Sequence, residues 1–490
     1  MSKIRVLDNV YDLITINMED RFKDNVAFRF YDTANDAVTT ILYKDYVQDI
    51  RKAVNYFQST IPEIKGKKIC LLTKNSYEYA VNTFGVVAAG AVLVLLNQRK
   101  SWDELHRELE LVEPSAILTD GDDYGFNDQL KAAYGDILRP MDGFRSYEPA
   151  QLTRCIDHEA LMVLMFTSGT TGRSKGVMLS EKNFFSVMRA HTQIGEHMMA
   201  YKHEPDLVMS QYTVLPMFHL GAFICLFSWA HAGWALNVSS DIRNFYKEVK
   251  RMPSQAMAVV PVIMNSLHHD VMRGRKDRLG ELWVPICSSA MFDPQVMLDM
   301  AEHGMFVVQT YGSTETCGDG IINYEQDEKH IRAVGKPDDH AEYKLDETGE
   351  ICIRGGCVML GYYKDPEATA EVLDADGWFH TGDLARVDED GFYYITGRKK
   401  NIIILDNGEN VSPEELENLL SKCEAVKECI VREKGKKICA VIYCGEADQQ
   451  TVRDFITETN RTLPLYKRMS AVEFSTEPLP RTGTGKLLRK

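Results

Sequence analysis

The chain has 490 residues, which is too long for one ordinary core and predicts about two to four domains. Its 44% hydrophobic and 26% charged residues are typical of a soluble globular protein. The net charge of −15 argues against a general binder of nucleic acids or anionic membranes. The longest apolar run, Phe84 to Leu96, is too short to span a bilayer, and the first residues lack the apolar core of a signal peptide. We therefore expect a cytoplasmic protein without an integral membrane segment.

The eleven cysteines form an odd set that contains no CxxC pair. Several lie inside apolar runs, including Cys70, Cys225, Cys287 and Cys439. We expect reduced, buried thiols rather than disulfides or a zinc site.

The first part of the chain alternates short apolar runs with helical patterns. A strand is expected at 67–73, a helix at 76–91, a strand at 92–97, an amphipathic helix at 102–111 and a strand at 115–120. This βαβαβ order predicts a parallel sheet with helices packed on it. The same pattern predicts further strands within residues 207–216, 255–262, 281–289 and 305–312.

The pattern changes twice toward the C-terminus. Residues 342–356 alternate apolar and polar side chains around a Thr-Gly turn, which predicts antiparallel strands. Further on, Ser412, Pro413 and Glu415 predict a helix that begins with a capping box, in which Glu415 reaches back to the N-cap. A strand, a helix and a last strand are expected at 436–445, 451–462 and 471–475.

The sequence thus predicts an α/β fold with two main parts. Residues 1–397 form a large N-terminal domain of mixed, largely parallel sheets with packed helices, including a smaller antiparallel subdomain at about 330–397. Residues 398–400 form a hinge, and 401–490 a small α+β C-terminal domain.

The stretch MVLMFTSGTTGRSKGVMLS, residues 162–180, runs from an apolar strand into a loop rich in glycine, hydroxyls and cations. Glycines let backbone N–H groups turn toward an anion, hydroxyls add donors and Lys175 adds charge, which together suit phosphate oxygens. The Gly-Lys-Ser/Thr ending of a Walker A loop is absent. A flexible surface loop is the alternative, but the regular order of hydroxyls and the Lys-Gly ending favour a phosphate site.

TSGTTGRSKG (167–176) resembles the phosphate loop of the AMP-forming adenylating superfamily, which includes acyl- and aryl-CoA synthetases, nonribosomal adenylation domains and beetle luciferases. Similar stretches follow in the family's order at TYGSTET (310–316), TGDLARVDEDGFYYITGRKK (381–400), NGENVSPEELE (407–417) and PRTGTGK (480–486). The chain is most like a bacterial-type acyl- or aryl-CoA ligase. The resemblance implies that ATP and Mg²⁺ activate a carboxylic acid to acyl-AMP with release of pyrophosphate, and that coenzyme A then forms the thioester.

The chemistry is mainly positioning and charge neutralisation, because a carboxylate oxygen must attack the α-phosphorus of ATP. Glu315 offers Mg²⁺ a hard oxygen, the alternative being a surface glutamate. By resemblance Tyr311 stacks on adenine, Gln309 binds its amino group and Thr314 meets the α-phosphate. The residues that the resemblance assigns to ATP or AMP are Thr167, Ser168, Gly169, Thr170, Thr171, Gly172, Lys175, Ser289, Ala290, Gln309, Thr310, Tyr311, Gly312, Thr314, Asp383, Arg398 and Lys486.

Asp383 can accept hydrogen bonds from both ribose hydroxyls, although a turn aspartate that binds its own backbone is the alternative. By resemblance Arg398 holds ribose or phosphate; solvated charge is the other reading of its Gly-Arg-Lys-Lys context. The terminal Lys486 would neutralise charge at the forming acyl phosphate. The C-terminal domain would then rotate about Lys400. This swing would bring a face with Gly408 and Glu409 to the site for thioester formation.

His219 lies in an apolar stretch, where a buried core histidine is the ordinary interpretation. Amino-acid-activating relatives carry an aspartate at this place, and His219 supplies no fixed negative charge, so the substrate is expected to lack an α-amino group. The family usually has two glycines where this chain has Ser288 and Ser289, which should narrow or polarise the pocket for a fatty or aryl acid. The expected acyl-pocket residues are His219, Phe223, Val262, Ser288 and Gly312, and the expected catalytic residues are Lys486, Thr170, Glu315, Arg398 and His219.

Two alternatives remain for the activity. The adenylate could pass to another acceptor, either the phosphopantetheine of a carrier protein or an oxygenase step, or the fold could serve as a non-catalytic nucleotide-binding protein. The expected partners are a small carboxylic acid, ATP and coenzyme A, with no nucleic acid, and the expected state is a monomer or homodimer.

Overall fold

The computed structural model describes residues 7–32, 35–167, 174–288, 294–405, 409–435, 437–481 and 487–488, without the side chains of Asp319 and Asn410. The chain forms two compact units. The first unit runs to Glu342 and includes Arg354–Gly377, and the second consists of Tyr343–Ile353 and the residues from Trp378 onward. The predicted hinge at 398–400 lies inside the second unit, and the predicted domain boundaries stay predictions.

Seven strands of the first unit form a sheet in the order β18-β8-β7-β4-β3-β5-β6. Neighbours from β7 to β6 are parallel, whereas β8 pairs antiparallel with both β7 and β18. The predicted βαβαβ segment is confirmed. Its elements are β3 (Lys68–Leu72), α3 (Tyr77–Ala88), β4 (Val92–Leu95), α4 (Trp102–Val112) and β5 (Ala116–Thr119). The other elements of this region are α2 (Tyr43–Thr60), α5 (Asn127–Tyr134), β6 (Leu138–Pro140), β7 (Leu161–Thr167), β8 (Lys175–Ser180) and β18 (Gly361–Tyr362).

Helix α4 shows how the sequence builds this layer. It begins at a capping box between Ser101 and Glu104, which satisfies backbone N–H groups at its start. Its side chains Leu105, Leu109 and Val112 recur at helical spacing and are fully buried in one hydrophobic cluster with strand residues of the sheet. The helix is thereby fixed on the sheet by one apolar face.

A second sheet of the first unit has nine strands in the order β15-β14-β13-β12-β11-β9-β10-β1-β2. The strands from β1 to β13 in this order are parallel to one another, and β2, β14 and β15 pair antiparallel at the two ends. The strands are β1 (Val26–Asp32), β2 (Ala37–Leu42), β9 (Ser210–Thr213), β10 (Ala235–Val238), β11 (Ala256–Val259), β12 (Val284–Cys287), β13 (Val308–Ser313), β14 (Gly318–Asn323) and β15 (Lys336–Pro337). The four strands predicted between residues 207 and 312 are therefore confirmed.

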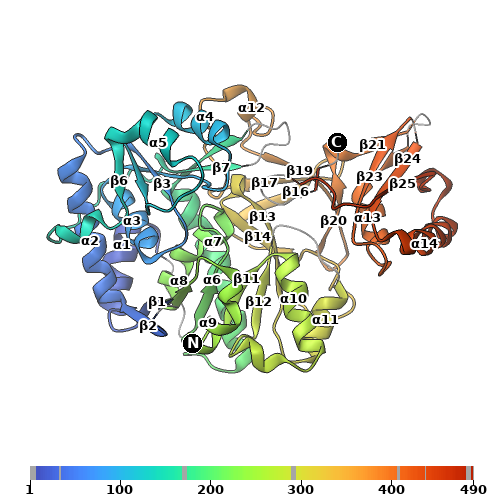
Figure 1. The fold of residues 1–490 in the computed structure, drawn as a ribbon, viewed down its shortest axis with the longest axis horizontal. Helices are drawn as coiled ribbons and strands as arrows, with labels where there is room; N and C mark the ends of the chain where they lie inside the picture. The colour runs from blue at the N-terminus through green and yellow to red at the C-terminus, as the bar shows by residue number, and fades with distance from the viewer. Residues whose placement is uncertain are drawn as a thin grey trace. The chain divides into compact units, whose positions relative to one another are not determined.

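Helices connect the parallel strands, as the crossover of parallel strands requires. Figure 1 shows α10 and α11 beside the strands β11 and β12. The helices of this region are α1 (Val10–Asp12), a π-helix at Leu13–Arg21, α6 (Glu181–Lys202), α7 (Leu220–Phe223), α8 (Cys225–Ala232), α9 (Phe245–Arg251), α10 (Pro261–Met272), α11 (Pro294–Glu302) and α12 (Pro366–Ala370).

The second unit contains the smaller sheet, β16-β17-β19-β20, with antiparallel pairs β17–β19 and β19–β20. Its strands are β16 (Ala341–Leu345), β17 (Glu350–Gly355), β19 (Phe379–Val387) and β20 (Tyr393–Arg398). The predicted antiparallel subdomain is thus present. A short pair, β21 (Ile403–Ile404) and β22 (Asn410–Val411), follows along the chain.

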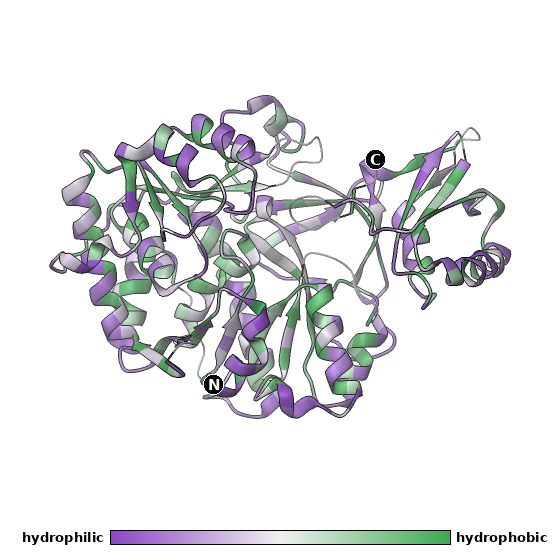
Figure 2. Cartoon of the chain, viewed as in Figure 1, coloured by the Kyte–Doolittle hydropathy of each residue, from purple (hydrophilic) through white to green (hydrophobic). Residues whose placement is uncertain are grey.

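The last part of the second unit packs α13 (Pro413–Leu420) and α14 (Gln449–Thr462) on a sheet of β23 (Glu428–Lys434), β24 (Lys437–Tyr443) and β25 (Ala471–Ser475). In Figure 2 helix α14 is mostly hydrophilic, and Val452 and Ile456 are its buried residues. Ser412 caps α13 as predicted, but the capping box is wrong because the Glu415 carboxylate accepts two hydrogen bonds from Lys467. An ion pair from a distant residue replaces the local bond.

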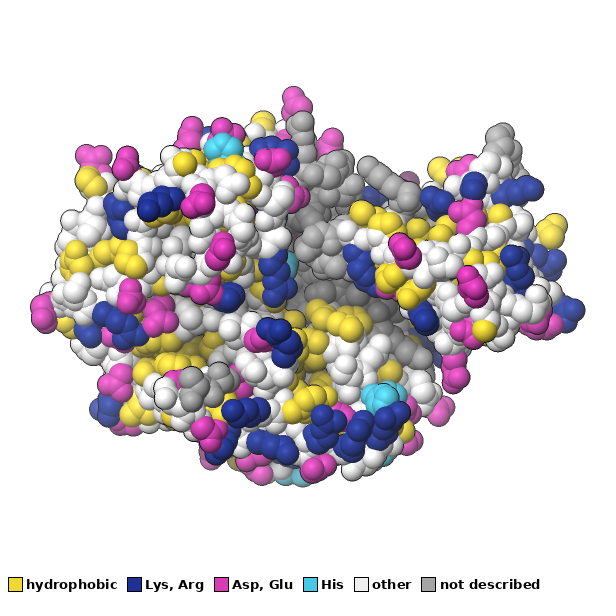
Figure 3. Space-filling model, viewed as in Figure 1, with side chains coloured by type: hydrophobic (Ala, Val, Ile, Leu, Met, Phe, Trp, Pro, Cys, Tyr) yellow, Lys and Arg dark blue, Asp and Glu magenta, His cyan; other side chains and the backbone are white. Residues whose placement is uncertain are grey.

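All eleven cysteines lie among the described residues, and each is free of a disulfide. Among the described helices, none is long and apolar enough to cross a membrane. Figure 3 shows basic side chains among acidic ones on the visible face of both units, so the negative charge is not gathered in one patch of that face.

Candidate active site

The ends of the predicted phosphate loop are fixed by strand pairing. Thr167 ends β7 and Lys175 begins β8, and the two residues face each other across the antiparallel pair. The Thr167 hydroxyl donates to the Lys175 carbonyl at 3.5 Å. The predicted residues that lie outside the described ones are Ser168, Gly169, Thr170, Thr171, Gly172, Ser289, Ala290, Gly408 and Lys486.

A buried ion pair holds the C-terminal end of this loop. The Lys100 ammonium pairs with the Glu108 carboxylate of α4 and donates to the Ser174 hydroxyl at 3.0 Å. Glu108 is 4% exposed, and burial raises the pKa of its carboxyl while Lys100 opposes the rise. Sequence reasoning missed this contact, because Glu108 is one of several acids on an amphipathic helix.

Tyr362 joins two of the predicted site residues. The Lys175 ammonium lies 4.6 Å from the centre of the Tyr362 ring, a cation–π contact. The Tyr362 hydroxyl donates to Glu315 Oε1 at 3.0 Å. Burial and the nearby Glu315 carboxylate raise the pKa of Tyr362, so its hydroxyl stays protonated as a donor. The structure thus brings together Lys175 and Glu315, which are 140 residues apart in the sequence.

Strand pairing explains why Tyr362 reaches this place. Tyr362 in β18 pairs with Val177 of β8, only two residues from Lys175. The Met359 N–H also donates to the Glu315 carbonyl at 2.8 Å. The sequence signal for this position of Tyr362 is weak, because the strand that carries it, β18, has only two residues.

The Glu315 carboxylate fits the predicted magnesium ion. It is half-buried, and Tyr362 orients one of its oxygens. Mg²⁺ prefers one or two carboxylates together with substrate phosphates and water, so the single Glu315 carboxylate is a sufficient protein ligand. Thr310 on β13 also has a buried hydroxyl without a hydrogen-bond partner, as expected where a polar ligand is absent.

The predicted adenine segment lies on β13 and in the turn that follows. Gln309 and Thr310 are each 6% exposed, whereas Tyr311 is partly exposed. A short 3-10 turn at Thr314–Thr316 follows Ser313, which forms a reciprocal cap with Thr316. Ligands of open α/β sheets bind at the carboxyl ends of the strands, and Glu315 lies just beyond that end of β13.

In the second unit, Asp383 and Arg398 face each other across β19 and β20. Arg398 Nε donates to Asp383 Oδ1 at 2.5 Å, and Nη2 donates to Oδ2 at 3.2 Å. Asp383 is 9% exposed. A carboxylate has about four acceptor sites, so Asp383 keeps capacity for a diol beside this fork.

Glu350 anchors the turn that carries Asp383. Its carboxylate is buried and accepts from the Gly382 N–H at 2.7 Å and from Lys399 Nζ at 2.7 Å. Lys399 precedes Lys400, the predicted hinge, which lies in a 3-10 turn at Lys399–Asn401. Glu350 is a supporting residue that the sequence did not single out.

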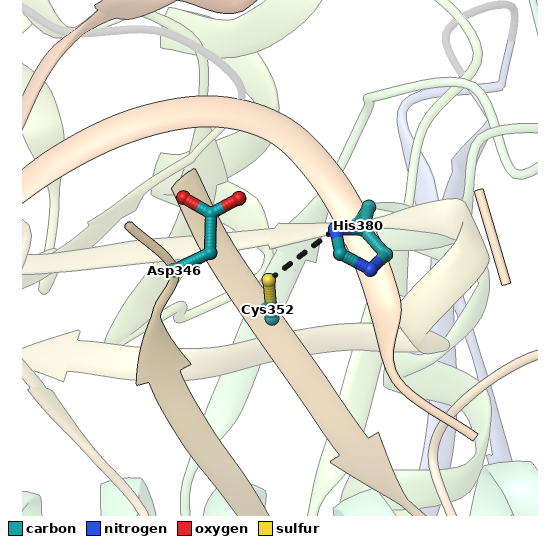
Figure 4. A group of neighbouring side chains, drawn as sticks. All are labelled: Asp346, Cys352 and His380. Atoms are coloured by element: carbon teal, nitrogen blue, oxygen red, sulfur yellow. Dashed lines mark hydrogen bonds between the residues drawn. The ribbon is translucent and has the colours of Figure 1, made fainter. Parts of the chain in front are cut away.

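Asp346, Cys352 and His380 form a group whose ligand atoms lie within 4.8 Å of one another (Figure 4). Cys352 Sγ is 3.5 Å from His380 Nδ1. Burial, Glu350 and Asp346 raise the pKa of the Cys352 thiol to about 11. The Lys399 ammonium already lies 3.9 Å from Asp346. The group is therefore better explained as part of an ion-pair network than as a metal centre.

A cavity of about 60 Å³ lies in the first unit between α6, α8 and the second sheet. Ser288, at the carboxyl end of β12, lines it, as the acyl-pocket prediction expects. The other predicted acyl-pocket residues lie outside its lining: Phe223 is buried against Phe184 and Phe227, Val262 is 72% exposed, His219 is exposed and Gly312 follows Tyr311 in β13.

The described residues around the remaining predictions are paired locally. Leu405 donates its N–H to the Glu409 carbonyl at 3.0 Å. Arg481 and Leu487, which flank residues 482–486, form an antiparallel bridge, and the Leu488 N–H donates to the Pro480 carbonyl at 2.8 Å. The residues before and after positions 482–486 are thus hydrogen-bonded to each other.

Comparison with known proteins agrees with this arrangement. A family model for AMP-binding enzymes matches residues 18–363, and a model for the AMP-binding enzyme C-terminal domain matches residues 415–486. A long-chain-fatty-acid–CoA ligase of Salmonella typhimurium is 29% identical over 89% of this chain and 86% of its own. A crotonobetaine/carnitine–CoA ligase of Shigella flexneri is 27% identical over 94% of each chain.

Solved structures share the fold. The o-succinylbenzoate CoA synthetase MenE from Bacillus subtilis, in complex with the acyl-adenylate intermediate OSB-AMP, has a TM-score of 0.82 at 23% identity and covers 98% of this chain and 97% of its own. ATP-bound MatB from Rhodopseudomonas palustris has a TM-score of 0.83 at 23% identity, with the same shares covered. Another MenE structure holds ATP and a magnesium ion. With a family match over more than half of its length, this chain belongs to the AMP-binding enzyme family and, like its curated relatives, is a ligase of the AMP-forming acid–thiol class.

Proposed function

We propose that the protein activates a carboxylic acid with ATP to acyl-AMP, releases pyrophosphate and transfers the acyl group to coenzyme A. The observation that carries this proposal is the grouping of Lys175, Tyr362 and Glu315 beside the ends of the loop at 168–173. A lysine, an oriented carboxylate and a glycine-rich loop are the parts that ATP and Mg²⁺ require.

Each residue has a distinct task in this proposal. Glu315 holds Mg²⁺, which neutralises charge on the phosphate oxygens when it is bound. Tyr362 keeps the Glu315 carboxylate in one orientation, and Lys175 adds positive charge to the phosphates. Tyr311, Gln309 and the rest of the β13 segment receive the adenine.

In this proposal, residues of the second unit bind the ribose. Asp383 accepts from the ribose hydroxyls, and Arg398 stays bonded to Asp383 and offers its remaining N–H groups to the ribose or phosphate. Glu350 supports both residues through Gly382 and Lys399. Lys486 neutralises charge at the forming acyl phosphate, and rotation about Lys400 then brings Gly408 and Glu409 to the thioester step.

A pyrophosphate-release assay with ATP, Mg²⁺ and a panel of short, medium and long fatty acids and aryl acids tests the first half-reaction. Mass spectrometry of the same mixtures with coenzyme A tests the second. We expect pyrophosphate with at least one acid and acyl-CoA without any carrier protein. Acyl-AMP that accumulates despite coenzyme A would indicate a carrier protein as the acceptor, and no pyrophosphate with any acid would overturn the proposal.

A further inference from the structure

The cavity between α6, α8 and the second sheet is lined by polar side chains that have no role in the function proposed above. His191 of α6 and Gln211 of β9 line it, together with Trp229, Trp234 and Ser288. Lysine and arginine are absent from its described lining. The cavity adjoins the proposed nucleotide segment, since Ser288 follows β12 and Cys287 of β12 pairs with Gln309 of β13.

One atom of each of two lining side chains lacks a hydrogen-bond partner. The Gln211 carboxamide is 1% exposed, and its Nε2 donates to Thr213 Oγ1 at 3.3 Å and to Cys225 Sγ at 3.2 Å. Its Oε1 has no partner, and neither has His191 Nε2. Buried polar atoms are nearly always satisfied in folded proteins, so two orphans at one cavity point to a bound group that satisfies them.

The chemistry of the two groups narrows the ligand. Gln211 Oε1 can only accept, so the ligand must donate to it. Burial lowers the pKa of His191 to about 4, which leaves the imidazole neutral at pH 7. A ligand with a second, distal carboxylate does not suit this cavity. That carboxylate would meet the acceptor oxygen of Gln211 and a neutral imidazole, and the described lining residues offer it no cation. A hydroxyl, by contrast, donates to Gln211 and also serves His191 in either tautomer.

The size and walls of the cavity limit the rest of the ligand. Its volume of about 60 Å³ corresponds to roughly five water-sized groups, too few for a long alkyl chain. Trp229 and Trp234, whose ring centres are 5.1 Å apart, supply apolar aromatic walls. The Ser288 hydroxyl occupies space near Gly221, where a Cβ on the glycine would lie 3.7 Å from it.

We propose that the acid activated by this enzyme is small and carries a hydroxyl group at the end that enters the cavity, where Gln211 and His191 recognise it. This inference rests on the proposed acid activation. It separates the chain from its relative that is named as a long-chain-fatty-acid ligase. A short hydroxyaryl acid or hydroxyalkanoic acid fits this description, and the chemistry shared by both is the distal hydroxyl.

The test compares matched acids in the pyrophosphate-release assay: 4-hydroxybenzoate against benzoate, 4-hydroxybutyrate against butyrate, and palmitate. We expect kcat/KM of the wild-type enzyme to favour the hydroxylated member of at least one pair by at least about tenfold, because a site that binds a hydroxyl rejects the analogue lacking it. Equal kcat/KM within both pairs, or preference for palmitate, would overturn the inference. Absence of pyrophosphate with every acid in the wider panel would instead remove the proposed function itself.

Two variants test whether Gln211 causes the preference for the hydroxylated acid. Gln211→Leu should lower kcat/KM for the hydroxylated acid about tenfold or more and leave the unsubstituted acid nearly unchanged. The matched control is Gln326→Leu, since Gln326 also has a buried, unpartnered Oε1 but lies outside the cavity lining. An unchanged ratio in folded Gln211→Leu counts against the inference. If that variant does not fold, thermal stabilisation of the wild type by the hydroxylated acid but not by its unsubstituted partner decides in its place.

Discussion

At the residue scale, Tyr362 is the contact that most directly links the predicted phosphate and metal residues. Its hydroxyl has one described acceptor, Glu315 Oε1, while its ring faces Lys175. The sequence predicted Lys175 and Glu315 because each stands in a recognisable motif. It could not predict Tyr362, whose position follows from the pairing of a two-residue strand with β8.

Tyr362→Phe separates the two contacts, because it removes the hydroxyl and keeps the ring. We expect the Mg²⁺ concentration for half-maximal pyrophosphate release to rise several-fold, since Glu315 loses the donor that orients it. The free energy of unfolding should fall by about 1.5–3 kcal/mol, the net value of a hydrogen bond to a charged group. The control is Tyr363→Phe, which removes a hydroxyl that accepts a hydrogen bond from Lys68 at 3.3 Å. Equal magnesium dependence in the two variants would contradict the role of Tyr362.

His191 gives a second prediction at this scale. Its pKa is lowered to about 4, so the folded protein binds fewer protons than the unfolded chain between about pH 6.5 and pH 4. The stability of the first unit that depends on neutral His191 is therefore present above pH 6.5 and is lost as the pH falls toward 4. The loss is at most about 3 kcal/mol, the free-energy equivalent of a shift from 6.5 to about 4.

Urea unfolding at pH 7 and pH 5 measures this slope. His191→Met should flatten it, because methionine does not titrate. His197→Gln removes an exposed histidine and should leave the slope as in the wild type. A His191→Met protein with the full wild-type slope would show that other groups, such as the buried His231, account for the pH dependence.

At the element scale, the individual helices and strands that local patterns predicted are present in the structure. Helix α4 and the strands around it follow from apolar spacing and a capping box, which are properties of neighbouring residues. The capping box at Ser412 failed because Glu415 pairs with Lys467, a residue 52 positions away. The supporting role of Glu350 was not predicted for the same reason, because its partners Gly382 and Lys399 lie on other strands or turns. Sequence patterns therefore predicted elements well and contacts between elements poorly.

Helix α4 also has a functional consequence through Glu108. Glu108→Gln would leave Lys100, whose side chain is 14% exposed, beside a neutral partner, and would loosen its bond to Ser174 at the end of the phosphate loop. We expect the KM for ATP to rise several-fold and the stability of the first unit to fall by about 3 kcal/mol. Glu110→Gln is the control on the same helix, because Glu110 is exposed and its described ion-pair partner is the histidine His106. ATP kinetics unchanged by Glu108→Gln would show that the ion pair is structural alone.

At the scale of the whole molecule, the proposed reaction needs two positions of residues 401–490 relative to the rest of the chain. In the proposed cycle Lys486 would serve adenylation and the face with Glu409 would serve thioester formation, so one rotation would exchange them. The family resemblance supplied this expectation, and amino-acid composition could not.

Two substitutions should separate the half-reactions. Lys400→Pro fixes the φ angle and removes the N–H at the proposed hinge, which should hinder the rotation. We expect thioester formation from pre-made acyl-AMP to fall about tenfold or more, with pyrophosphate release changed less than about threefold. Lys486→Ala should give the converse result, because it removes charge needed at the acyl phosphate and leaves the rotation intact.

Separate assays of pyrophosphate release and of acyl-CoA formed from synthetic acyl-AMP measure the two steps. Lys400→Ala is the control for the hinge, since it removes the same ammonium but restores a rotatable backbone. Loss of both steps in Lys400→Pro would mean that the substitution disturbs the Arg398–Asp383 contact two residues away rather than a rotation. Equal loss of both steps in Lys486→Ala would show that this lysine does not act in adenylation alone. A protein in which each variant loses one step and keeps the other must use two positions of residues 401–490 in one catalytic cycle.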